Sequence, residues 1–143
     1  MPSVTTTLKD LEKDGPILEV YFLIPSELEK KYIEEKIPIP EPVIVKALID
    51  TGASACAIKR EIPERLGLKP TGVTNISTPS STQECYQYFI RMVIPSHQIT
   101  YQGVFIAAPM ETGDVNCLIG RDVLKSGILI YIGYTNQFTL SLL

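Results

Sequence analysis

The sequence predicts an all-β fold with one or two short helices. Short segments rich in Val, Ile, Tyr and Phe recur along the chain, and turn residues such as Gly, Pro, Asn and Ser separate them. With 143 residues, the chain is long enough for one domain with a sizeable core. Its hydrophobic content of 45% and its charged content of 20% are those of an ordinary globular protein.

The N-terminal part divides into an arm and a first strand. Residues 1–15 are polar and include a charged run, so we interpret them as a flexible N-terminal arm. Residues 16–24 are rich in Val, Tyr, Phe and Ile and predict the first strand, which Pro25 ends. A single domain is therefore expected over residues 16–143.

A short helix is expected after the first strand. Ser26 and Glu29 have the spacing of a capping box, in which the Ser26 side chain caps the helix and Glu29 reaches back to its N-terminus. The charged residues 29–36 are typical of a solvent-exposed helix face, and a partner-binding arm is the alternative interpretation.

The most informative strand covers residues 43–49 and leads into an acidic residue. Its side chains are apolar on both faces apart from Lys46, which predicts a strand covered on two sides. Asp50 follows directly, and Gly52 allows a tight turn because glycine adopts backbone angles closed to other residues. A buried strand that ends in such a turn holds a carboxylate rigidly.

The remaining elements are strands, turns and one more helix. A hairpin is expected over residues 72–94, and a second hairpin is expected around the turn at residues 133–136. The other predicted elements are a short strand at residues 55–58, a helical turn at 61–68 closed by Gly67, a strand at 101–108 and a helix at 121–125.

Composition and charge exclude several classes of function. The net charge of -3 gives no electrostatic basis for binding nucleic acid or an anionic membrane surface. No apolar run approaches the roughly 20 residues of a membrane helix. The three cysteines are widely spaced and odd in number, and the N-terminus lacks the pattern of a signal peptide, which favours the reducing cytoplasm. With a single His and no Cys-x-x-Cys pair, we expect no metal site and no cofactor.

Two motifs together resemble those of the retropepsin-like aspartic proteases. The first, Ala47-Leu48-Ile49-Asp50-Thr51-Gly52-Ala53-Ser54, has the family pattern of two apolar residues followed by Asp, Thr or Ser, Gly, and Ala or Ser. The second, Cys117-Leu118-Ile119-Gly120-Arg121-Asp122-Val123-Leu124, matches the family's apolar-apolar-Gly element, which Arg and a short helix follow. The resemblance covers roughly residues 16–142. It implies a closed, barrel-like acid protease fold with one flap hairpin per chain, in a cellular or bacterial family member.

The resemblance also implies an aspartic endopeptidase that works as a homodimer. It assigns catalysis to Asp50, Thr51 and Gly52. Hydrolysis of an amide by carboxylates needs two acids, one to take a proton from water and one to give a proton to the carbonyl oxygen. Because the chain has one Asp-Thr-Gly triplet, the second Asp50 must come from an identical chain across a two-fold axis.

Residues for substrate binding and for support of the site follow from the same resemblance. Ala53 leaves room for a peptide substrate in extended conformation, and the hairpin tip closes over that peptide. The tip is small and polar, and it consists of Thr78, Pro79, Ser80, Ser81 and Thr82. Behind the catalytic loop, the resemblance places Ile119, Gly120 and Arg121, where glycine permits a close approach.

Two departures from the family pattern leave other functions open. Ser54 stands where retroviral enzymes carry the Asp that pairs with the helix Arg, so Arg121 must find another acceptor, and the hairpin tip lacks glycines. A non-catalytic retropepsin-like module that dimerises or binds peptides is therefore the alternative to an enzyme. A β-barrel binding protein with an accidental Asp-Thr-Gly triplet is a third interpretation.

Overall fold

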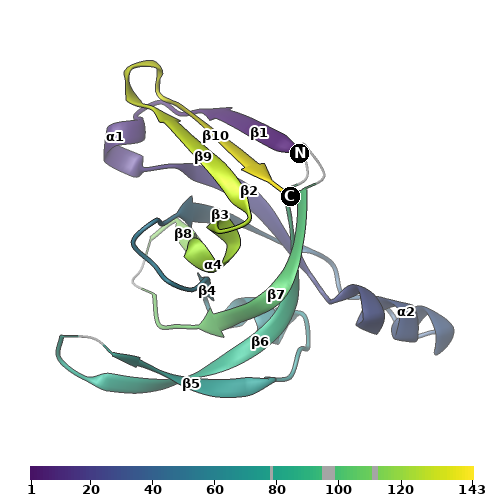
Figure 1. Ribbon diagram of the computed structural model, residues 1–143. Helices are drawn as coiled ribbons and strands as arrows, with labels where there is room; N and C mark the ends of the chain where they lie inside the picture. Colours follow the sequence, from purple (N-terminus) through teal and green to yellow (C-terminus); the bar gives the residue numbers. More distant parts are fainter. Residues whose placement is uncertain (78, 95–98, 111–112) are drawn as a thin grey trace.

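The computed structural model describes residues 1–77, 79–94, 99–110 and 113–143, and its described residues form mainly β-structure (Figure 1). The strands are β1 (Ser3–Thr7), β2 (Ile17–Leu23), β3 (Val43–Ile49), β4 (Ala57–Ile58), β5 (Gly72–Ser77), β6 (Thr82–Ile94), β7 (Ile99–Ala107), β8 (Val115–Ile119), β9 (Gly127–Ile132) and β10 (Gln137–Leu142). The helices are short: α1 (Leu11–Asp14), α2 (Ser26–Glu34), α3 (Glu61–Arg65) and α4 (Arg121–Leu124), with a 3-10 turn at Gly133–Thr135. The predicted all-β class is confirmed.

Among the described strands, six close into a barrel. Their order is β2-β3-β8-β4-β7-β6, and β6 returns to pair with β2. The interior is apolar, and two of its largest side chains, Phe22 and Phe105, meet edge to face with ring centroids 5.4 Å apart. A second sheet of three strands, ordered β1-β10-β9, lies beside the barrel (Figure 1). The closed barrel that the family resemblance implies is thus present.

The long strand β6 also builds the predicted hairpin. Its first half pairs with β5 from Ser77 opposite Thr82 to Gly72 opposite Gln87, and its second half pairs with β7. The β5–β6 hairpin therefore projects from the wall of the barrel (Figure 1). The C-terminal hairpin of β9 and β10 and the turn at Gly67, whose φ is 66°, also follow the prediction.

Strand β3 has the predicted bounds but not the predicted double cover. Its burial alternates, so that Val43, Val45, Ala47 and Ile49 face the core while Ile44 is exposed. A strand in the wall of a small barrel has one face inside and one face outside, whatever the polarity of its outer residues. The apolar outer residue made the sequence pattern resemble a strand covered on both faces.

The expected flexible arm is instead part of the folded structure. Strand β1 pairs with β10 in antiparallel register, with Val4 opposite Leu140, and both side chains are buried. Leu11 is fully buried in the same core, and its N–H donates to Asn136 Oδ1 at 2.9 Å. Val4 of β1 and Leu11 of α1 thus anchor the segment in the core, although most of the residues around them are polar. We therefore infer that the domain includes residues 1–15.

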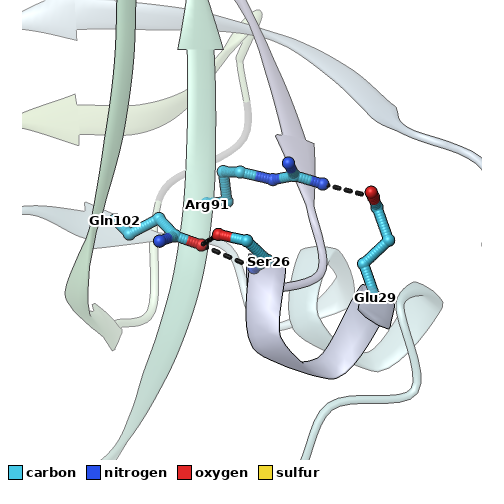
Figure 2. A network of polar contacts seen from close by, with 4 residues as sticks. All are labelled: Ser26, Glu29, Arg91 and Gln102. Atoms are coloured by element: carbon cyan, nitrogen blue, oxygen red, sulfur yellow. Dashed lines mark hydrogen bonds and ion pairs between the residues drawn. The ribbon is translucent and has the colours of Figure 1, made fainter. Parts of the chain in front are cut away.

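The capping box predicted for the second helix is wrong. The helix begins at Ser26 after Pro25, and no side chain caps it. The Ser26 N–H and hydroxyl both donate to Gln102 Oε1, at 2.7 and 2.8 Å, and Glu29 Oε2 accepts from Arg91 Nη2 at 2.6 Å (Figure 2). Both side chains bind the neighbouring strands β6 and β7, and these tertiary partners replace the local cap.

Candidate active site

Asp50 lies in a tight loop at the end of β3. Its carboxylate Oδ1 accepts a hydrogen bond from the Gly52 N–H at 2.9 Å, and its carbonyl accepts from the Ala53 N–H at 3.2 Å. Asp50 is half-buried, while Thr51 and Gly52 are exposed. The loop thus orients one carboxylate oxygen through its own backbone and leaves the residues around it open to solvent.

Strand β8 and helix α4 hold this loop from behind. The Asp50 N–H donates to the Ile119 carbonyl at 2.9 Å, and the Arg121 N–H donates to the Ala53 carbonyl at 2.9 Å. A Cβ atom on Gly120 would lie 2.7 Å from the carbonyl carbon and oxygen of Ala55, so only glycine allows this approach. The structure therefore brings together the two motifs that the sequence analysis singled out.

Arg121 has an acceptor in this arrangement despite the absence of an Asp at position 54. Its Nη1 donates to the Thr51 carbonyl oxygen at 2.8 Å. Together with its backbone N–H, Arg121 thus makes two hydrogen bonds to the Asp50 loop of the same chain. The ion pair of the family pattern is replaced by a charged donor on a backbone carbonyl.

A second connection, not predicted from the sequence, joins the end of the loop to α4. Asp122 Oδ2 accepts from the Cys56 N–H at 3.1 Å, and Asp122 Oδ1 accepts from the Cys56 thiol at 3.0 Å. The Gly120 N–H in turn donates to Cys56 Sγ at 3.2 Å. Burial and the bond to Asp122 raise the pKa of the Cys56 thiol well above its usual 9.0, so the thiol stays protonated and donates.

No local sequence pattern predicts the contact between Cys56 and Asp122. The two residues are 66 positions apart, and a lone cysteine in an apolar stretch indicates only a small core residue. All three cysteines are in fact buried, as free thiols. Burial of Cys117 likewise raises the pKa of its thiol.

The predicted substrate-binding residues lie in two places. Ala53 is in the Asp50 loop, and Pro79, Ser80, Ser81 and Thr82 are exposed at the tip of the β5–β6 hairpin. Thr78 lies outside the described residues. The hairpin tip and the loop between β3 and β4 point to the same side of the molecule, at the left in Figure 1. Two surface hollows of about 600 and 410 Å³ lie elsewhere, and Asp50 lines neither of them.

The family assignment follows from this geometry and from comparison with known sequences. Residues 41–126 match the family model described as "gag-polyprotein putative aspartyl protease". The match covers more than half of the chain and includes both the Asp50 loop and the β8–α4 segment that holds it. The chain belongs to the retropepsin-like aspartic protease family.

The fold is that of a solved retropepsin-like structure. A retropepsin-like aspartic protease from Rickettsia conorii is 14% identical, with a TM-score of 0.53 over 96% of this chain and 89% of that chain. The EIAV protease complexed with the inhibitor HBY-793 is 16% identical, with a TM-score of 0.47 over 82% of this chain and 92% of that chain. No curated protein sequence gives a significant match.

Within the described ranges, no three or more His, Cys, Asp or Glu side chains gather in a group that could hold a metal ion. None of the helices in those ranges is long and apolar enough to cross a bilayer.

Proposed function

We propose that this retropepsin-like protein is an aspartic endopeptidase whose catalytic dyad forms from two copies of Asp50 in a homodimer. The observation that carries the proposal is the Asp50 carboxylate, which the Gly52 N–H orients in a loop that β8 and α4 hold from behind. Such a rigid, solvent-accessible carboxylate is one half of an acid pair. Among the described residues, no hydrogen bond or ion pair links Asp50 to a second carboxylate of the same chain.

The chemistry requires the two carboxylates to share one proton. Two acids held near contact cannot both ionise, so one remains a neutral donor while the other is a carboxylate. The carboxylate takes a proton from water, which attacks the peptide carbonyl, and the neutral acid protonates the carbonyl oxygen. The acid that took the proton from water then donates it to the amide nitrogen as the C–N bond breaks. The other carboxylate takes a proton from a hydroxyl of the intermediate, which restores the shared proton and leaves a carboxylic acid and an amine.

The substrate in this proposal is a peptide in extended conformation. It lies between the Asp50 loop and the tip of the β5–β6 hairpin, described for residues 79–82, which acts as a flap. Backbone hydrogen bonds hold an extended peptide whatever its sequence, and the pockets around it select side chains. Thr51 stiffens the paired loops across the axis, and Ala53 leaves room for the chain of the substrate. The free, buried cysteines are consistent with the reducing cytoplasm.

The test compares the wild type with Asp50→Asn in digestion of a peptide library. The amide cannot act as a base, and a homodimer carries the change twice, so cleavage should fall to background. The melting temperature near neutral pH should stay the same or rise, because the change removes the repulsion between two abutting acids. Asp114→Asn is the matched control, because Asp114 is an exposed acid whose ion pair with Lys46 is long, at 4.0 Å.

The same experiment separates the enzyme from the alternative, a non-catalytic module that dimerises or binds peptides. Such a module would retain its binding or dimerisation in Asp50→Asn and would cleave nothing in either form. Equal cleavage by the Asn variant and the wild type would overturn the proposed function.

A further inference from the structure

The segment between α2 and β3 has a sequence that neither the fold nor the proposed function explains. Residues 37–42 are Ile-Pro-Ile-Pro-Glu-Pro. Proline fixes its own φ and drives the residue before it away from the helical region, so the three prolines hold the whole segment extended. Ile37 and Ile39 are 41% and 42% exposed, and among the described residues no backbone hydrogen bond involves residues 38–42. The segment thus resembles a single strand without a sheet.

Both ends of this segment are fixed. The Lys36 N–H donates to the Ile33 carbonyl at 3.3 Å, and Lys36 has a φ of 56°, in the left-handed region. The Ile37 N–H donates to the Tyr32 carbonyl at 2.8 Å, which completes a Schellman motif at the end of α2. The contacts of Figure 2 fasten α2 to the barrel, and at the other end of the segment Val43 is buried in β3. Because the segment is held in place beforehand, binding a partner costs little ordering entropy.

The spacing of the prolines leaves one edge of the segment able to pair and the other edge unable. In an extended chain, consecutive residues direct their N–H and C=O groups to opposite edges, and alternate side chains share a face. Ile39 and Glu41 therefore present N–H donors at one edge, whereas the prolines leave the other edge without any. The side chains of Ile37, Ile39 and Glu41 share one face. The segment can thus join a sheet as its last strand, and no further strand can follow it.

Recognition as a polyproline helix fits this spacing less well. That helix has three residues per turn, so residues at positions i and i+3 share a face. Pro38, Pro40 and Pro42 are two residues apart and fall on three different faces. A groove that binds two prolines from one face finds no such pair here, which favours strand addition.

We propose that residues 37–42 add as an edge strand to the open sheet edge of a partner protein. That edge has two neighbouring apolar pockets, which take Ile37 and Ile39, and a basic side chain that faces Glu41. Glu41 is exposed and is the one charged residue of the segment, and no ion pair among the described residues engages it. Its charge therefore complements a basic partner and helps to fix the register of the added strand.

The partner surface lies away from the candidate active site. Helix α2, which leads into the segment, projects at the right in Figure 1, whereas the hairpin tip and the loop between β3 and β4 point to the left. A partner bound to residues 37–42 thus leaves Asp50 accessible, and the inference holds whether or not the protein is a protease.

The first step of the experiment identifies the partner with the full chain. A photoreactive diazirine analogue of leucine replaces Ile39 in one protein and Ile33 in the control, because Ile33 is 60% exposed on α2 and lies outside the segment. Both proteins are irradiated in the cells that naturally produce the chain, and mass spectrometry identifies the crosslinked proteins and their crosslinked residues. We expect position 39 to crosslink to an edge strand of one protein, and to do so more strongly than position 33.

The second step measures how tightly variants of the chain bind that purified protein. The double substitution Ile37→Ser and Ile39→Ser should weaken binding about thirtyfold or more, because two apolar side chains lose their pockets. Ile33→Ser is the matched control and should bind as the wild type does. Glu41→Gln keeps the backbone N–H, whereas Glu41→Pro removes it, so the Pro variant should bind about tenfold more weakly than the Gln variant.

Three results would overturn the inference. The first is a crosslink from position 39 that is no stronger than the one from position 33, or that joins only a second copy of this chain. The second is equal binding of the double Ser variant and the wild type. The third is a Glu41→Pro variant that binds as well as Glu41→Gln, which is the behaviour of a polyproline-helix ligand.

Amide hydrogen exchange keeps the pairing testable if Glu41→Pro does not fold. In the wild type, the N–H groups of Ile39 and Glu41 should exchange about tenfold more slowly in the complex than in the free chain. Unchanged exchange of both groups would overturn strand addition. All of these variants retain Asp50 and its loop, so their cleavage of a peptide library should match that of the wild type.

Discussion

Behind the Asp50 loop, the space at Gly120 admits a hydrogen atom and nothing larger. A Cβ atom there would lie 2.7 Å from the Ala55 backbone and 3.0 Å from the Ala53 carbonyl oxygen. Both contacts are to backbone atoms, so no side chain can rotate away to relieve them. The conformation of Gly120 itself is ordinary, with φ of -94°, so the requirement for glycine is one of distance alone.

We expect Gly120→Ala to lower the free energy of unfolding by about 2 kcal/mol or more, because backbone must move to accept the methyl group. Cleavage should fall further than stability explains, since the displaced backbone carries Asp50. Gly113→Ala is the matched control, because a Cβ at Gly113 would meet no atom of the described residues within 4 Å. The measurements are urea unfolding and peptide cleavage of both variants. Equal stability and equal cleavage of the two would contradict the close approach of Gly120 to the Ala55 backbone.

The buried thiols predict a loss of stability in alkali. Burial, together with the nearby Asp122, raises the pKa of the Cys56 and Cys117 thiols in the folded chain. Above about pH 9, therefore, only the unfolded chain releases these protons. The unfolded state then binds fewer protons, and the free energy of unfolding falls by about 1.4 kcal/mol per pH unit for each thiol. Below pH 9 the effect is absent.

The measurement is urea unfolding of the wild type and Cys56→Ala between pH 8 and 10. The alanine variant should show a shallower fall with pH, whatever its stability at pH 8. The same slope in both proteins would show that the folded chain does not hold the Cys56 proton.

Helix α2 is held against the barrel by side-chain contacts with strands that are distant in sequence. It has no fully buried residue and no side-chain cap. Leu28 and Tyr32 are partly buried against the core, and polar contacts join Ser26 to Gln102 of β7 and Glu29 to Arg91 of β6 (Figure 2). The Arg91 side chain is 17% exposed, and among the described residues its Nε has no partner. Removing the carboxylate opposite this guanidinium would leave a largely buried charge uncompensated.

We expect Glu29→Ala to lower the free energy of unfolding by about 2 kcal/mol and to speed amide hydrogen exchange in α2. Glu27→Ala is the matched control on the same helix. Glu27 pairs with Lys30 at 3.6 Å, but its side chain is 90% exposed, and exposed pairs contribute roughly 0–1 kcal/mol. Equal effects of the two substitutions would show that the Glu29–Arg91 pair does not fasten the helix.

At the scale of the whole molecule, one chain supplies a barrel, a hairpin and one aligned carboxylate. The termini lie together in the second sheet, where Ser3 stands opposite Ser141. Two copies could therefore be joined by a flexible linker without changing either barrel. Because the proposed dyad takes one Asp50 from each chain, the specific activity should be proportional to the fraction of the protein that is dimeric.

Dilution of the wild type below its dimer dissociation constant should therefore reduce the specific activity, in parallel with the dimer fraction. A tandem fusion of two chains through a Gly/Ser linker is the control, since its effective concentration does not change on dilution. Specific activity that stays constant for a monomeric wild type would contradict a shared site.

The sequence by itself determined most of the barrel strands and the two motifs of the candidate site, but it did not predict β8 as a strand. Strand β3 was predicted within its observed bounds, and the resemblance to the family placed Gly120 behind the Asp50 loop. These predictions succeeded because alternating or continuous apolar runs, turn residues and the two motifs are local in sequence.

Only the tertiary structure decided which partners the polar side chains take. Ser26 and Glu29 have the spacing of a local cap, yet they bind Gln102 and Arg91, which are far away in the sequence. The polar N-terminus becomes an edge strand because Val4 meets Leu140 in the core. A polar side chain that becomes buried loses its hydrogen bonds to water and needs a partner in the protein. Which side chains become buried depends on how distant strands close into a barrel, and no local sequence pattern specifies that.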